Sequence, residues 1–101
     1  SARVSGSARI LGGRIDGYAA VRSQGDFTFN LSLNGGYEWT AFREDPPGQP
    51  SHVVFRFGCE RHPLEEWTPG LVLRLCSEHG EVDMADEIGA ILRSVRTYFK
   101  L

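Results

Sequence analysis

Apolar residues recur along this chain at two different spacings, and this change limits the fold more than any other feature. Over the first three quarters of the chain they alternate with polar residues, as in half-buried β-strands. After residue 83 they recur every three or four positions, as on one face of an α-helix, at Met84, Ala85, Ile88, Ile91, Leu92, Val95 and Phe99. The pattern predicts a β-sheet followed by one C-terminal amphipathic helix over residues 83–99.

The ends of this predicted helix carry the charges that its dipole favours, with acids in the first turns and bases in the last. Asp83 is placed to cap the N-terminus through its side-chain oxygen. Gly89 in the helix interior costs about 1 kcal/mol relative to Ala. We therefore expect Gly89 and Ala85 to mark a close approach of the helix to the sheet.

The clearest strands flank the Asn-Gly-Gly segment at 34–36. A two-residue turn there would place Leu31 opposite Glu38 and put an acid on the apolar face. A three-residue turn places Leu31 opposite Trp39, so that the apolar faces of both strands coincide. We predict the three-residue turn and the register that it gives.

Further strands are predicted at 8–11, 17–23, 52–59 and 71–76. The Pro-rich segment 44–50 separates two of the strands, because Pro cannot donate to a strand ladder. The connection 60–70 is long, with one helical turn expected at 63–67. Together these elements predict a single α+β domain over 1–101, an antiparallel β-meander of five to six strands packed against the C-terminal helix. The plan is similar to that of pleckstrin-homology-like (PH-like) barrels, in which a C-terminal helix closes a β-meander.

Composition excludes several classes of function. The 101 residues are 41% hydrophobic and 24% charged with a net charge of −2, which is typical of a globular domain. The sequence carries no excess of basic residues to hold nucleic acid or an anionic membrane. No apolar run approaches the roughly 20 residues of a membrane span. Two cysteines are too few for a disulfide scaffold, so we expect free thiols and a cytoplasmic location.

Two similar tetrapeptides are the strongest hint of chemistry in the sequence. CERH at 59–62 and CSEH at 76–79 each place a Cys three residues before a His. Thiolates and imidazoles suit tetrahedral zinc, and the spacing lies within the range of structural zinc sites. An alternative function is therefore a zinc-binding module. Its ligands would be Cys59, His62, Cys76 and His79.

The direction of the predicted strands argues against this zinc site. Cys59 and Cys76 each end a predicted strand, and consecutive antiparallel strands end at opposite edges of their pair. Strands of this length separate the two thiols by about 20 Å, at about 3.3 Å a residue. That distance is too large for one metal ion or for a disulfide. We accordingly expect no cofactor, no bound metal and two unbonded cysteines.

The leading functional hypothesis is a non-catalytic protein-interaction module, either an adaptor-type domain or a small neutralising, immunity-type binder. Trp67 lies in a turn-rich loop, where it either folds back over the core or serves as an exposed anchor for a partner. An acidic rim favours a basic protein partner through electrostatic steering. The rim comprises Glu60, Glu65, Glu66, Glu78, Glu81, Asp83 and Asp86. A further alternative is a small enzyme or ligand-binding domain with an unrecognised pocket.

Overall fold

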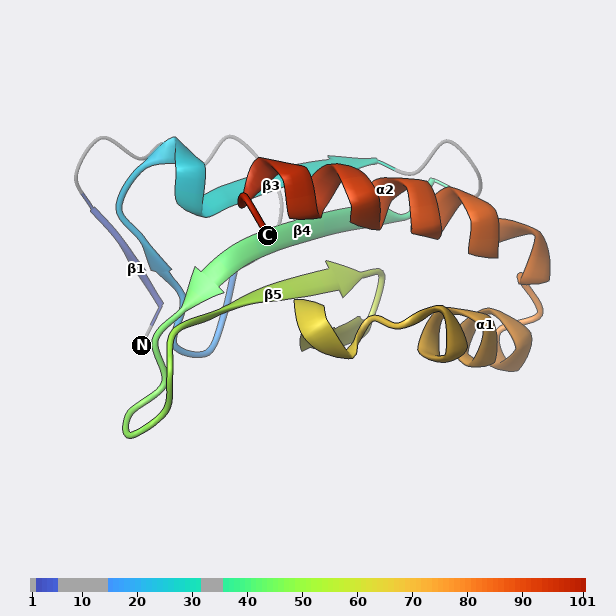
Figure 1. Ribbon diagram of the computed structural model, residues 1–101, viewed down its shortest axis with the longest axis horizontal. Helices are drawn as coiled ribbons and strands as arrows, with labels where there is room; N and C mark the ends of the chain where they lie inside the picture. Colours follow the sequence, from blue (N-terminus) through green and yellow to red (C-terminus); the bar gives the residue numbers. More distant parts are fainter. Residues whose placement is uncertain (1, 6–14, 32–35) are drawn as a thin grey trace.

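The computed structural model describes residues 2–5, 15–31 and 36–101 (Figure 1). Its centre is a four-stranded antiparallel sheet in the order β3-β4-β5-β6. The strands are β3 (Phe27–Leu31), β4 (Glu38–Glu44), β5 (His52–Phe57) and β6 (Glu60–Pro63). A separate two-stranded parallel pair is formed by β1 (Arg3–Val4) and β2 (Ala20–Val21). The helices are α1 (Pro69–Glu78) and α2 (Ala85–Tyr98), with the 3-10 turns η1 (Gln24–Asp26), η2 (Leu64–Glu66) and η3 (Val82–Met84).

The sheet is covered on both faces, which gives the domain two apolar cores. The helices cover one face, along which α2 runs in Figure 1. Residues 15–21 cover the opposite face. The helix-side core comprises Ala41, Val53, Phe55, Phe57, Leu64, Trp67, Val72, Cys76, Met84, Ile88, Leu92, Val95 and Phe99. The N-terminal core comprises Ala19, Val21, Phe27, Phe42 and Val54, with Ile15 packed against it.

The predicted α+β class and the C-terminal helix are confirmed, whereas in the described residues the antiparallel meander has four strands instead of the five to six predicted. The analogy to a PH-like barrel is wrong, because in the described part of the chain β3 and β6 are free edges of an open sheet. The connection 60–70 contains the fourth strand, β6, as well as the expected helical turn, which is η2. Within 17–23 the strand is limited to Ala20–Val21, and the predicted strand 8–11 lies outside the described residues.

Helix α2 confirms one of the three parts of the prediction for residues 83–99, the apolar stripe. Its apolar stripe faces the helix-side core, where the side chains are at most 5% exposed at Met84, Ile88, Leu92, Val95 and Phe99. Asp83 is not the N-cap, because it lies inside η3, which leads directly into α2. The expected close approach at Gly89 is also wrong. Among the described residues, a Cβ there would meet the Arg93 side chain, at 3.8 Å, and no atom of the sheet.

The segment predicted as the strand 71–76 is helix α1, and this is the largest error of the sequence interpretation. Thr68 begins the helix, since its Oγ1 accepts a hydrogen bond from the backbone N of Leu71 at 3.2 Å, and Pro69 follows as the first helical residue. Val72 and Cys76, four residues apart, are buried, whereas Leu73 is 52% exposed. The alternating leucines therefore belong to a helical pattern that mimics a strand over six residues.

The predicted register of β3 and β4 is wrong by one residue. Leu31 lies opposite Glu38, as a two-residue turn would give, and Trp39 lies opposite Asn30. The physical reason is that β4 buries side chains on both faces. Phe42 packs in the N-terminal core with its cross-strand partner Phe27, while Trp39 packs against the helix-side core. The turn itself, at 32–35, lies outside the described residues.

Candidate metal centre

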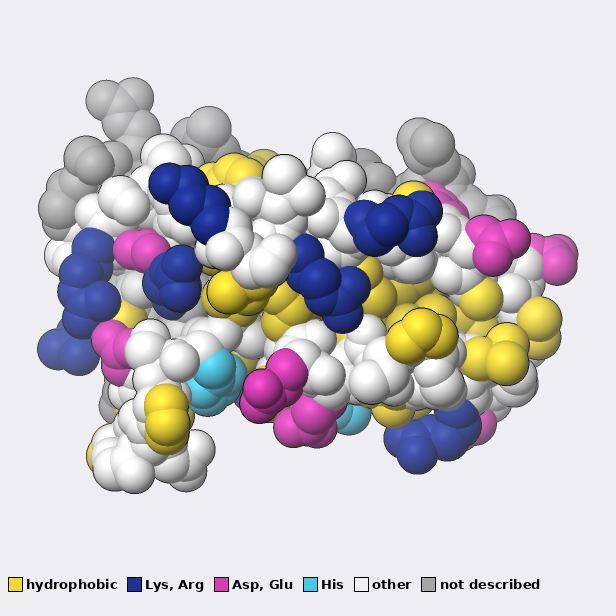
Figure 2. All heavy atoms as spheres, in the orientation of Figure 1, with side chains coloured by type: hydrophobic (Ala, Val, Ile, Leu, Met, Phe, Trp, Pro, Cys, Tyr) yellow, Lys and Arg dark blue, Asp and Glu magenta, His cyan; other side chains and the backbone are white. Residues whose placement is uncertain are grey.

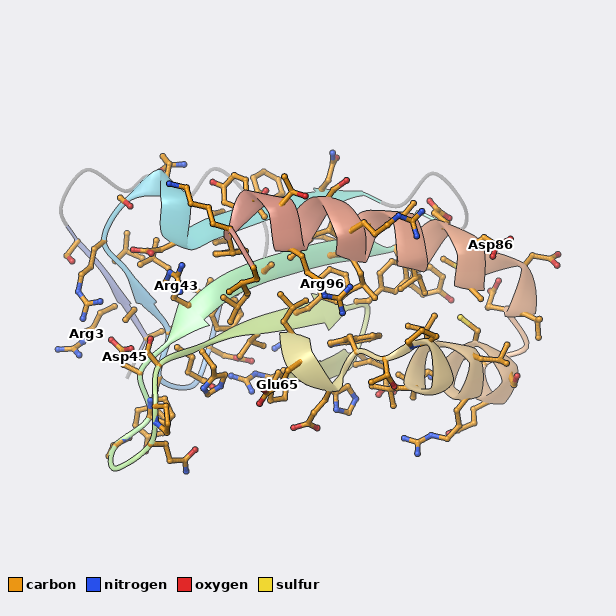
Figure 3. The ribbon with its side chains drawn as sticks, in the orientation of Figure 1. Arg3, Arg43, Asp45, Glu65, Asp86 and Arg96 are labelled. Atoms are coloured by element: carbon orange, nitrogen blue, oxygen red, sulfur yellow. The ribbon has the colours of Figure 1, made fainter. Side chains whose placement is uncertain are left out.

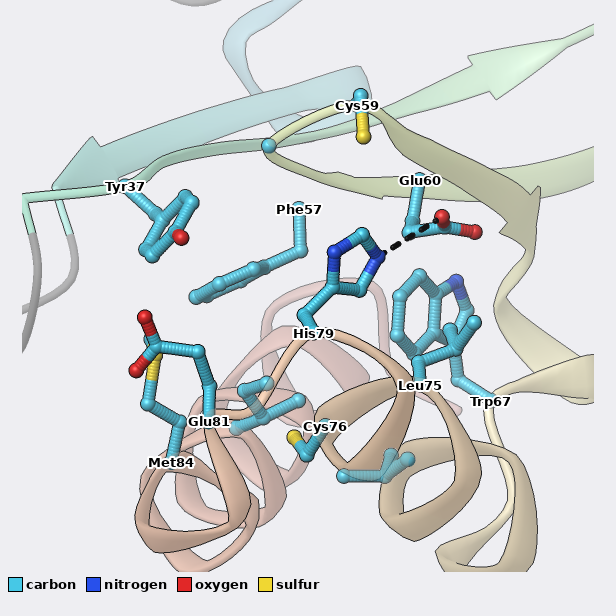
Figure 4. Close-up of a pocket in the computed structure, with 13 residues that line it drawn as sticks. Tyr37, Phe57, Cys59, Glu60, Trp67, Leu75, Cys76, His79, Glu81 and Met84 are labelled. Carbon is cyan, nitrogen blue, oxygen red and sulfur yellow. Dashed lines mark hydrogen bonds and ion pairs between the residues drawn. The ribbon is translucent and has the colours of Figure 1, made fainter.

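A small cavity opens between the β5–β6 turn and the C-terminal end of α1 (Figure 4). Its volume is about 80 Å³. The lining is mostly apolar, with a few polar side chains: Tyr37, Phe57, Gly58, Cys59, Glu60, Trp67, Val72, Leu75, Cys76, His79, Glu81, Met84 and Ile88. Both cysteines of the repeated tetrapeptides line this cavity, together with one of their histidines.

Tight turns at both segments bring the tetrapeptides together. Gly58 and Cys59 form the turn between β5 and β6. Gly58 has a φ of 60°, a left-handed conformation that tight hairpin turns require and that Gly adopts without steric cost. Helix α1 ends at Glu78 with His79 as its C-cap, and Gly80 follows with a φ of 67°. The backbone N of Glu81 donates to Cys76 O at 2.7 Å, and that of Gly80 donates to Ser77 O at 3.2 Å, which together form a Schellman motif.

The premise of the expected separation of about 20 Å between the thiols, that Cys76 ends a strand, is therefore wrong. Cys76 lies in a helix that leads back to the β5–β6 turn, so no pair of opposed strand ends exists here. Both cysteines are free thiols in the structure.

Three metal-ligating side chains converge at the mouth of the cavity. The donor atoms of Cys59, Glu60 and His79 all lie within 4.8 Å of one another. His79 Nε2 lies 3.4 Å from Glu60 Oε2, drawn as the dashed line in Figure 4. A tetrahedral zinc ion with bonds of about 2.0–2.1 Å holds its nitrogen and oxygen ligands about 3.3 Å apart. We call Cys59, Glu60 and His79 the metal-donor cluster.

The other two predicted zinc ligands lie beside this cluster. His62 Nε2 is 3.2 Å from Glu60 Oε1, the carboxylate oxygen that does not face His79. The hydrogen bonds from His62 and His79 lower the pKa of Glu60, with that from His62 the larger cause. Cys76 is buried, and burial raises the pKa of its thiol, as does the nearby charge of Glu81. Among the described residues, Cys76 is not part of the group of donor atoms that converge within 4.8 Å.

Glu60 is the donor that the sequence interpretation missed as a ligand. The sequence predicts Glu60 as part of an acidic rim, although it lies inside the CERH tetrapeptide. On a strand, residues two apart point to the same side, so Glu60 and His62 share a face. Their cross-strand partners Phe57 and Phe55 belong to the helix-side core, which places both side chains toward α1. Strand alternation within β6 could have indicated this arrangement.

Trp67 folds back into the core and is not an exposed anchor. It is 2% exposed, and its Nε1 donates to Phe55 O at 3.0 Å and to His62 O at 3.2 Å. The Trp67 carbonyl in turn accepts a hydrogen bond from Arg96 Nη2 on α2 at 3.1 Å. Trp67 thus joins β5, β6 and α2 beside the cavity.

The acidic residues do not form one continuous rim on the face shown in Figure 2. Acidic side chains lie there in separate groups with basic side chains between them, and Figure 3 labels Glu65 in one group and Asp86 in another. Glu60 and Glu81 line the cavity, whereas Glu65, Glu66 and Glu78 are exposed. The residues of the predicted rim therefore lie in two different environments.

Comparison of the chain with models of protein families, with curated proteins and with solved structures finds no match. Among the described residues, no helix combines the length and the apolar character needed to cross a membrane. Functional inference for this chain therefore depends on the geometry of its own residues.

Proposed function

We propose that this domain binds a divalent zinc ion through Cys59, Glu60 and His79. The observation that carries the proposal is the convergence of a thiol, a carboxylate and an imidazole within 4.8 Å, from two segments well separated in sequence. Zinc accepts all three donor types in tetrahedral geometry. Three protein ligands leave a fourth position for water or a ligand, as in zinc sites that are not purely structural.

The surroundings of the cluster favour a cation. His79 follows the last turn of α1, whose C-terminal end carries a partial negative charge of roughly half an elementary charge. Glu81 lines the same cavity and adds a further acid. Glu60 is held by His62, in the way that outer-shell partners commonly orient a ligating carboxylate. Cys59 is exposed, so rotation about its side-chain bonds can bring the sulfur to bonding distance.

Cobalt substitution tests the proposal directly. Purified protein is stripped with a chelator and titrated with Co²⁺, and we expect one ion per chain with the near-ultraviolet absorption of a cobalt–thiolate bond. His79→Ala and Cys59→Ser should each weaken binding at least tenfold, while Cys76→Ser, a neighbouring thiol outside the cluster, should bind as the parent does. Lack of a thiolate band in the parent, or a band that depends on Cys76 alone, would contradict the proposal.

A second candidate function is the protein-interaction module, supported by the exposure of three acids. Glu65 and Glu66 project from η2, and the carboxylate of Glu78 lies 3.9 Å from Arg74, a loose pair. A basic partner would be steered to such a surface without an aromatic anchor. Reversing both charges, with Glu65→Lys and Glu66→Lys, should reduce the amount of basic partner that the protein binds. It should also make this binding less dependent on salt concentration. Unchanged capture by the reversed protein would refute this role for η2.

A further inference from the structure

We propose that the cavity beside the metal-donor cluster binds a small neutral molecule with a nitrogen donor at one end and a short apolar chain at the other. The donor would occupy the open coordination position, and the chain would fill the cavity. This inference rests on the proposed zinc binding, and the experiment below separates the failure of one from the failure of the other.

The floor of the cavity offers a ligand almost nothing but apolar surface. Its deepest residues are at most 8% exposed: Phe57, Trp67, Val72, Cys76, Met84 and Ile88. The one strong donor among them, Trp67 Nε1, is already bonded to two backbone carbonyls. A polar group placed at this depth would lose its hydrogen bonds to water without replacement, which is costly. The inner part of the ligand must therefore be apolar.

The volume limits the size of that apolar part. A cavity needs a volume of roughly 10–15 Å³ to hold one water molecule, and an apolar cavity of roughly 150 Å³ holds benzene. The cavity here, at about 80 Å³, lies between the two. A chain of a few carbon atoms fits this space, whereas an aromatic ring or a long acyl chain exceeds it.

The charges at the mouth select the other end of the ligand. A thiolate from Cys59 and the carboxylate of Glu60 together neutralise a divalent ion, and Glu81 adds a negative charge nearby. Among the described residues that line the cavity, none is Lys or Arg. An anionic head group would meet net repulsion with no cationic partner. A neutral nitrogen donor binds zinc without that penalty, since imidazole is itself a common zinc ligand.

A series of 1-alkylimidazoles tests both halves of the inference on cobalt-loaded protein. We compare 1-methyl-, 1-propyl- and 1-butylimidazole, with butyrate as an anionic probe of similar chain length, in mildly alkaline buffer. Binding is followed by the change in the cobalt visible spectrum. The affinity should rise by about fourfold for each methylene buried, until the cavity is full. Butyrate should bind more weakly than 1-propylimidazole.

A matched variant distinguishes the cavity from the metal. Cys76→Leu fills the cavity from its floor and leaves the metal-donor cluster intact, so it should remove the chain-length dependence while 1-methylimidazole still binds. If the variant fails to fold, the chain-length series on the parent decides the question alone. A cobalt spectrum with chain-independent affinity, or with butyrate bound more tightly, overturns this inference but not zinc binding. Absence of the cobalt–thiolate spectrum overturns both.

Discussion

Two clusters of polar side chains lie on opposite faces of β5 and β6, and they differ in how their charges are matched. On the N-terminal face, Asp16 accepts hydrogen bonds from Arg56 and Arg61, and Glu44 accepts one from Arg61 at 2.5 Å. On the helix side, Glu60 contacts two histidines and, within the described part of the chain, no Arg or Lys.

The first cluster is a closed network, which we call the back-face network: Asp16, Glu44, His52, Arg56 and Arg61. Glu44 also accepts a hydrogen bond from the backbone N of Tyr18 at 3.2 Å, so it ties the N-terminal segment to the sheet. Gly17 allows this approach, because a Cβ there would lie 2.7 Å from Glu44 Oε2. Matched charges at this face hold the fold together. Under the proposed zinc binding, the donors at the other face, which have no Arg or Lys partner among the described residues, instead serve an ion.

Removing Glu44 is the strongest test of this difference. Glu44→Ala should destabilise the domain by about 3–5 kcal/mol, because the buried Glu44 carboxylate is the charged hydrogen-bond partner of the Tyr18 backbone N, His52 and Arg61. Glu60→Ala, the matched change on the helix side, should cost less than about 1 kcal/mol in the metal-free protein. Urea unfolding with a chelator present measures both. Equal losses would show that the helix-side cluster also serves the fold; Glu44→Gln gives a milder comparison if Glu44→Ala is unfolded.

Zinc should stabilise the folded protein through the helix-side cluster and not through the back-face network. At a free ion concentration of 100 times Kd, the free energy of unfolding should rise by about 2.7 kcal/mol. A chelator should remove this gain, as should His79→Ala, while a back-face variant such as His52→Gln should keep it. Thermal melts with and without zinc provide the measurement. A gain that persists in His79→Ala would place the ion elsewhere.

The smallest expected effect is a pH dependence from Glu60. Its pKa is lowered from 4.5 in the folded protein, so its carboxylate contributes stability above pH 4.5. This contribution is lost as the pH falls through the lowered pKa. In metal-free protein the stability difference between the parent and Glu60→Gln should therefore shrink below pH 4.5. Chemical unfolding of both proteins across the acidic range checks this, and a difference that grows on acidification would contradict it.

Those parts of the fold with one clear periodicity could be predicted from the sequence, and those with two competing patterns could not. The stripe of α2 spans four turns, too long for any strand pattern to imitate. In α1, leucines at 71, 73 and 75 alternate as in a strand, although Thr68 and Pro69 form a helix start signal just before them. In β4, Trp39 and Phe42 are buried on opposite faces, so one apolar face could not fix the register.

The wrong strand prediction for residues 71–76 also led to the wrong expectation for the candidate site. CERH and CSEH have the residue types and spacing of a zinc site, but a strand at 71–76 would hold the two tetrapeptides far apart. Once α1 is a helix, Cys59 and His79 meet, and Glu60 supplies the third donor. The sequence contains no signal for the cavity, because its walls come from β5, α1 and α2 together.

The contact between Glu60 and His79 also has a topological consequence. The chain from one to the other contains β6, η2 and α1, so an ion shared by these two residues would close it into a ring of 20 residues. A permanent link around a ring of this length lowers the entropy of the unfolded chain by an amount worth about 3 kcal/mol. Under the proposed zinc binding, loss of the ion would let β6, η2 and α1 open as one unit. Amide hydrogen exchange in α1 would then report occupancy of the metal from backbone groups that do not contact it.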